Sequence, residues 1–67
     1  MKLIINGKEQ NFDGSLSLAA LLETLGMKQD RIAVELNREI IRRETWAETK
    51  LSDGDKLEIV HFVGGGK

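Results

Sequence analysis

The residues that most clearly suggest a chemical role are three consecutive glycines, Gly64-Gly65-Gly66. They follow an apolar stretch and precede Lys67. Glycines have no side chain to pack and lose the most conformational entropy when they are fixed, so we expect a flexible arm here. An arm without Cβ atoms can enter a narrow enzyme tunnel and present a terminal carboxylate for reaction. The same glycines could be a frayed end, and the run alone favours neither interpretation.

Other reactive groups are scarce. The chain has no cysteine, so sulfur cannot be held on a side-chain thiol, and disulfides and thiolate zinc sites are excluded. His61 is the only histidine, and we expect it to be structural or on the surface. Glu44 and Glu48 have the i, i+4 spacing that is common on solvated surfaces. A Gly-Gly-Gly-Lys string can end a phosphate-binding loop, yet no Ser or Thr follows it here.

Composition excludes several classes of protein. A chain of 67 residues fits one small domain, and ten basic against eleven acidic residues give a net charge of −1. These scattered charges leave no electrostatic footprint for nucleic acid. The apolar runs are too short for a membrane span of about 20 residues, and the N-terminus has no apolar core of a signal peptide. We therefore expect a cytoplasmic, soluble protein that is monomeric when free.

The body that must position the glycines begins with a hairpin and a helix. Residues 2–6 have the composition of a strand, and Asn6-Gly7 is typical of a two-residue turn that leads into a polar edge strand over residues 8–12. The spacing of four leucines then predicts one amphipathic helix over residues 17–25, capped by a serine and stopped at Gly26. Those leucines are Leu18, Leu21, Leu22 and Leu25.

The second half predicts three more strands. Residues 32–36 and 39–41 form a strand pair, and residues 56–62 form the last strand. Between them, residues 42–50 are a packed connection anchored by Trp46, with at most one helical turn. One helix can cover one face of a mixed four- to five-stranded sheet, so the fold class is α+β, with a domain over residues 1–63 and a tail over 64–67.

Alternation along the strands separates the two faces of this sheet. The residues expected to point inward are Leu3, Ile5, Val34, Leu57 and Ile59. Ile4, Val60 and Phe62 then point to the uncovered face, where they would lie close together if the first and last strands are neighbours. Such a group is either a partner-docking patch or ordinary exposed surface.

The whole pattern resembles the thiamine-biosynthesis sulfur carriers of bacteria. The resemblance rests on the Asn-Gly hairpin, LAALLETLG, VELN at 34–37, RRETW, LSDGDKLEIV at 51–60 and the closing HFVGGG. It implies a ubiquitin-like β-grasp fold. It also implies a protein that is a cosubstrate of enzymes and not an enzyme itself, with no bound cofactor.

The family's chemistry is implied with it. An adenylating, E1-like enzyme uses ATP to activate the terminal glycine carboxylate, sulfur from a cysteine desulfurase or another donor displaces AMP, and the thiocarboxylate supplies thiazole synthase. Matching the motif places sulfur on Gly66, with Gly65 and Gly64 as the rest of the arm. Lys67 departs from the pattern, so either it is trimmed, or it is an addition from expression, or the activity is a different one; we expect one of the first two. A carrier like the small subunit of molybdopterin synthase and a non-covalent β-grasp binding module remain alternatives.

Overall fold

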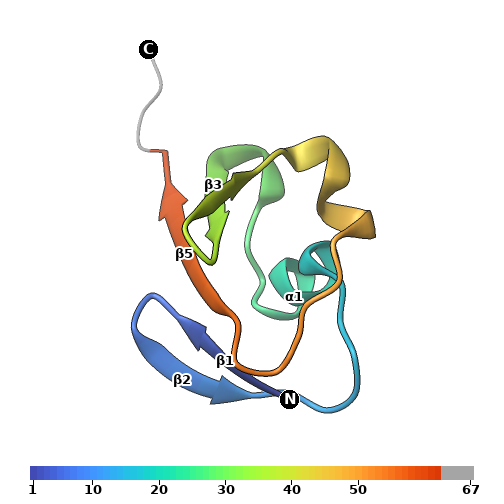
Figure 1. Cartoon of the computed structure of the whole chain (residues 1–67). Helices are drawn as coiled ribbons and strands as arrows, with labels where there is room; N and C mark the ends of the chain where they lie inside the picture. The colour runs from blue at the N-terminus through green and yellow to red at the C-terminus, as the bar shows by residue number, and fades with distance from the viewer. Residues whose placement is uncertain (63–67) are drawn as a thin grey trace.

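The computed structural model describes residues 1–62, in which five strands form one mixed sheet and one α-helix covers a single face (Figure 1). The strands follow the order β2-β1-β5-β3-β4, with β1 and β5 parallel and the other neighbours antiparallel. Their bounds are β1 Lys2–Ile5, β2 Lys8–Asn11, β3 Ile32–Leu36, β4 Glu39–Ile41 and β5 Lys56–His61. The predicted α+β class is confirmed. The predicted domain boundary at residue 63 and the tail 64–67 lie outside the described residues.

The hairpin β1–β2 turns at the predicted dipeptide. Asn6 and Gly7 have φ of 51° and 83°, the two positive values that a type I′ turn requires. Cα partners run from Lys2 with Asn11 to Ile5 with Lys8. The short polar strand β2 is an edge of the sheet, as its composition predicted.

The α-helix α1 (Leu18–Thr24) confirms the prediction from the leucine spacing. Ser17 is its N-cap, and the Ser17 hydroxyl accepts a hydrogen bond from the Ala20 N–H at 3.1 Å. Gly26, with φ of 73°, follows the C-cap Leu25, and its N–H donates to the Glu23 carbonyl at 3.0 Å. With both caps included, the helical segment covers the predicted residues 17–25.

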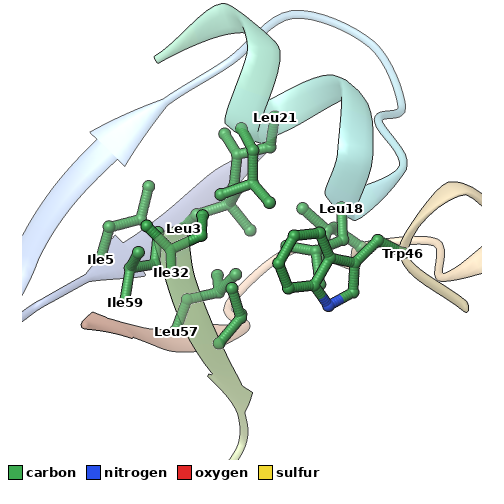
Figure 2. Close-up of a cluster of buried hydrophobic side chains, with 11 residues drawn as sticks. Leu3, Ile5, Leu18, Leu21, Ile32, Trp46, Leu57 and Ile59 are labelled. Atoms are coloured by element: carbon green, nitrogen blue, oxygen red, sulfur yellow. The ribbon is translucent and has the colours of Figure 1, made fainter. Parts of the chain in front are cut away.

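The core lies between α1 and the sheet (Figure 2). Three leucines of the helix are fully buried, and they meet the inward side chains of β1, β3 and β5. All five residues predicted to point inward are buried: Leu3, Ile5, Val34, Leu57 and Ile59. Their burial supplies the main stabilising term for this small domain, because no buried polar or charged side chain occurs among residues 1–62.

The connection before β5 is a 3₁₀ helix, η2 (Arg43–Glu48), and a second short 3₁₀ helix, η1 (Gln29–Arg31), precedes β3. Trp46 is only 2% exposed, and its indole lies beside Leu18 (Figure 2). The indole Nε1–H donates to the Ile41 carbonyl at 2.9 Å. The predicted role of Trp46 as the anchor of this connection is therefore confirmed. Within residues 1–62, no helix has the length and apolar character needed to cross a membrane.

Candidate functional site

Strand β5 is the element that leads to the predicted reactive glycines. It runs through the centre of the sheet, between β1 and β3, and ends at His61 (Figure 1). Gly64, Gly65 and Gly66 lie outside the described residues. The described part of the candidate site is therefore the strand that carries the arm, together with the face of the sheet around it.

The β3 side holds β5 along its length. Cα partners run from Leu36 with Leu57 to Ile32 with His61. One further hydrogen bond extends this ladder, because the Phe62 N–H donates to the Arg31 carbonyl at 2.8 Å. The chain is thus fixed to the sheet up to Phe62, immediately before the segment that contains the glycines.

The β1 side holds β5 by a side chain where the backbone ladder stops. Backbone pairing covers Ile4 with Lys56 and Ile5 with Leu57 before β1 ends. Beyond that point the Asn6 amide continues the ladder: its Oδ1 accepts from the Ile59 N–H at 2.7 Å. Its Nδ2 donates to the Ile59 carbonyl at 3.2 Å. The turn residue that ends the hairpin thereby also stabilises the strand that leads to the arm.

The outer face, which we define as the side of the sheet not covered by α1, carries the predicted docking residues. Val60 and Phe62 are each 57% exposed, whereas Ile4 is half-buried. The strands β1 and β5 are neighbours as supposed, yet the register places Ile4 opposite Lys56. Val60 lies four residues further along β5, about 13 Å at the rise of a strand. The expected closeness of Ile4 to Val60 is therefore wrong, and Ile4 does not share a patch with Val60 and Phe62.

Ile40 of β4 is the apolar residue that the sequence patterns missed. It is 71% exposed, and with Val60 it lines a hollow of about 280 Å³ on the outer face. The rest of the lining is Ala33, Val34, Glu35 and Glu58. In a strand of only three residues, alternation could not show which way Ile40 points. The apolar area of the outer face consequently extends from β5 toward β4 and away from β1.

Charged residues divide this outer face. Glu35 and Glu58 are exposed cross-strand partners, and they border a second hollow that Asn37, Arg38 and Lys56 also line. At the β2 edge, Lys2 Nζ lies 3.0 Å from Glu9 Oε2. The hydrogen bond to Glu9 raises the pKa of Lys2 above its usual value, with the negative charge of Glu9 as the next cause.

The remaining candidate groups do not assemble into a catalytic site. His61 is exposed at the end of β5. Glu44 and Glu48 are on η2, where Glu44 Oε2 lies 3.6 Å from Arg42 Nη2. A hydrogen bond from its own backbone, followed by the charge of Arg42, lowers the pKa of Glu44. Among residues 1–62, no group of three or more His, Asp or Glu side chains could hold a metal ion.

Comparisons with a family model and with known proteins agree with one another. A model of the ThiS family matches residues 3–66. The chain is 52% identical over 66 residues to a thiazole synthase of Paramagnetospirillum magneticum. The aligned region covers 98% of this chain and 20% of that protein. It is 40% identical over 65 residues to the sulfur carrier protein ThiS of Bacillus subtilis, covering 96% of this chain and 98% of that protein.

A solved structure agrees with these sequence matches. The crystal structure of the thiamine biosynthesis protein ThiS from Geobacter metallireducens has a TM-score of 0.85 and 42% identity, and the match covers 98% of this chain and 100% of that chain. The predicted ubiquitin-like β-grasp fold is confirmed by this likeness. The chain spans about a fifth of the length of the first thiazole synthases that it matches, and nearly all of the Bacillus carrier.

Proposed function

Since the chain belongs to the ThiS family of sulfur carriers in thiamine biosynthesis, we propose that it carries sulfur as a thiocarboxylate on Gly66 and donates it for thiazole synthesis. The observation that carries this proposal is that the family match continues through residue 66 and so includes all three glycines. The absence of cysteine supports it, because a carboxylate at the end of the arm is then the available position for sulfur.

The chemistry explains why a partner must act first. A free carboxylate is a poor acyl donor, because its negative charge and its resonance both oppose attack by a nucleophile. In the proposed reaction a carboxylate oxygen of Gly66 attacks the α-phosphorus of ATP, and pyrophosphate leaves. Hydrosulfide or a persulfide then attacks the carbonyl carbon of the acyl-adenylate. The C–O bond to AMP breaks as the C–S bond forms. With hydrosulfide this step leaves the thiocarboxylate directly. With a persulfide it leaves an acyl disulfide, whose S–S bond a thiol then cleaves to give the thiocarboxylate and a disulfide.

The catalytic groups for these steps belong to partners. An adenylating, E1-like enzyme would supply the groups that bind ATP and any Mg²⁺ that stabilises charge on the departing phosphate. A cysteine desulfurase or another donor would supply sulfur. The carrier contributes position, because a docked body raises the effective concentration of the arm at the partner's site. We also propose a cytoplasmic location, where the ATP that adenylation consumes is available.

Thiazole synthase is the proposed acceptor of the sulfur. Proteins of that name in two bacteria contain a segment similar to this whole chain, and the segment is about a fifth of each. Such a combination in one polypeptide would keep donor and acceptor at a high effective concentration. For this chain we propose the same exchange between docked partners, with Val60, Phe62 and Ile40 on the outer face as the apolar contacts and Ile4 as a separate one.

Intact-mass spectrometry tests the proposal. We would incubate a chain ending at Gly66 with ATP, the adenylating enzyme of the same organism and a sulfur source. The expected gain equals the mass difference between one sulfur and one oxygen atom, and omitting ATP should abolish it. A chain lacking Gly65–Lys67 should gain nothing. The chain ending at Lys67 should react only after Lys67 is removed.

Two results would contradict the proposal. One is an unchanged mass for the chain ending at Gly66 although the enzyme and sulfur source are active on another carrier. The other is growth without thiamine when the chain lacking Gly65–Lys67 replaces the full chain. That second result would favour the non-covalent binding module, which does not need the arm.

A further inference from the structure

Two carboxylates face each other across the centre of the outer face. Glu35 of β3 and Glu58 of β5 are direct Cα partners, and both are exposed. Side chains at such positions point to the same side, and like charges placed directly opposite destabilise a sheet. Neither carboxylate has a cationic nitrogen within 4.0 Å among residues 1–62, although Lys2 and Glu9 form an ion pair at 3.0 Å on the same face.

The surroundings of this pair are apolar on one side. Glu35 and Glu58 share the lining of the 280 Å³ hollow with Ile40 and Val60, which are 71% and 57% exposed. A partner that covers these apolar residues must also remove water from the two carboxylates. Burying two unpaired negative charges would cost more than the apolar contact returns, unless the partner brings a cation. The hollow therefore fits a surface that presents a basic side chain beside an apolar one.

The cationic side chains of residues 1–62 do not occupy that position. Arg38 and Lys56 line the second hollow with the two glutamates, on the other side of the pair. No ion pair joins either cation to Glu35 or Glu58 in the described part of the chain. The outer face thus changes along β5 from basic at Lys56, through acidic at Glu58, to apolar at Val60. Such a sequence of charges can fix the orientation of a docked partner as well as its affinity.

We propose that a lysine or arginine of the adenylating enzyme binds between Glu35 and Glu58, while an apolar side chain beside it enters the hollow at Ile40 and Val60. This inference rests on the proposed function, which requires that enzyme to dock. Arginine suits the position best, because its planar guanidinium can donate to two carboxylates at once. Glu58 lies on the strand that leads to the arm, so the same contact also sets where the arm begins on the partner.

Steady-state kinetics of AMP release by the adenylating enzyme test this inference, with a sulfur source present so that the acyl-adenylate is consumed. The carrier, ending at Gly66, is the varied substrate, and the variants are E35Q, E58Q and the double variant. E23Q, on an exposed position of α1, is the control for the loss of one negative charge. Each glutamine at the pair should raise KM roughly tenfold with kcat unchanged, and E23Q should leave both unchanged. The unfolding midpoint of the pair variants should stay equal or rise, because a repulsion is removed.

Several outcomes would overturn the inference. A double variant with the KM of the unsubstituted carrier would do so, and so would an equal rise in KM for E23Q, which would show that only net charge matters. A KM that rises together with a fall in the unfolding midpoint would assign the effect to folding. In each of these cases the unsubstituted carrier still becomes a thiocarboxylate and the proposed function stands. Failure of the unsubstituted carrier to form AMP at all would instead contradict both.

Discussion

At the scale of single residues, Asn6 has two roles that depend on different parts of the same amino acid. Its backbone adopts the positive φ of a type I′ turn, which asparagine tolerates better than most residues. Its side-chain amide forms hydrogen bonds with both the N–H and the carbonyl of Ile59, a residue 53 positions away in the chain. Asn6 therefore ends the first hairpin and also binds the hairpin to the strand that carries the arm.

The substitution N6D separates these roles. Aspartate keeps the turn and the acceptor oxygen, but it places a second oxygen against the Ile59 carbonyl where an N–H donated before. We expect a loss of about 1 kcal/mol in the free energy of unfolding at neutral pH, measured by urea denaturation. N11D is the matched control, because Asn11 is exposed on β2 and its side chain has no hydrogen-bond partner within residues 1–62.

The stability of N6D at low pH gives a second test. Below the ordinary pKa of aspartate, about 3.9, the introduced carboxyl gains a proton and can donate again, so the deficit relative to N11D should shrink. Equal stability of N6D and N11D at neutral pH would show that the Asn6 amide contributes nothing to holding β5.

At the scale of elements, the agreement between pattern and structure follows from local chemistry. The helix was predictable because the leucine spacing, the serine cap and Gly26 all indicate the same segment. Strand bounds for residues 32–36 and 39–41 were predicted for the same reason, with a turn between them at Asn37 and Arg38.

The register of pairing between strands distant in the sequence was not predictable from local patterns. Which residue of β5 lies opposite Ile4 depends on the register between the two ends of the chain, and no local pattern encodes it. The expected closeness of Ile4 to Val60 was wrong because it depended on this register. Ile40 was missed because its orientation is set by pairing with Glu35 and not by its own short strand. For the candidate site, the sequence could therefore name β5, but not the composition of the face beside it, and the glycines stay a prediction.

The 3₁₀ segment η2 offers a test of one element. Trp46 anchors it by burial and by the bond from its indole N–H to the Ile41 carbonyl. W46F keeps most of the apolar contact and removes the donor, so we expect a loss of about 1–3 kcal/mol in the free energy of unfolding. W46A should lose about 3–5 kcal/mol.

The size of these losses decides what the experiment will look like. A domain of this length has a free energy of unfolding of roughly 3–10 kcal/mol, so the loss expected for W46A removes about a third of that stability or more, and the loss for W46F removes less. Circular dichroism during urea titration measures both, since the fluorescent residue itself is replaced. A W46A variant as stable as the original would show that η2 is not held by its tryptophan.

At the scale of the whole molecule, the proposed function gives the folded body and the terminal glycines separable tasks. Every buried apolar residue among residues 1–62 lies between Leu3 and Ile59. The outer face that we assign to docking is likewise formed before residue 63. Folding and recognition should therefore survive changes that destroy the reactive end.

A chain lacking Gly65–Lys67 tests this separation. It should unfold at the same urea concentration as the full chain and should act as a competitive inhibitor of carrier adenylation. Because it keeps the docking surface, its inhibition constant should be close to the KM of the full carrier, within about threefold if the arm contributes little to binding. Competition is measured by varying both chains against the adenylating enzyme. Failure to inhibit, with the fold intact, would show that recognition depends on the arm.

The central place of β5 has a consequence for how the protein is made. Ribosomes synthesise β1 to β4 before β5, yet β1 and β3 have no contact as neighbours until β5 lies between them. A nascent chain that stalls before residue 56 lacks the strand that joins the two halves of the sheet. We therefore expect premature termination to yield fragments that do not fold and are degraded, so that they do not occupy the proposed adenylating enzyme.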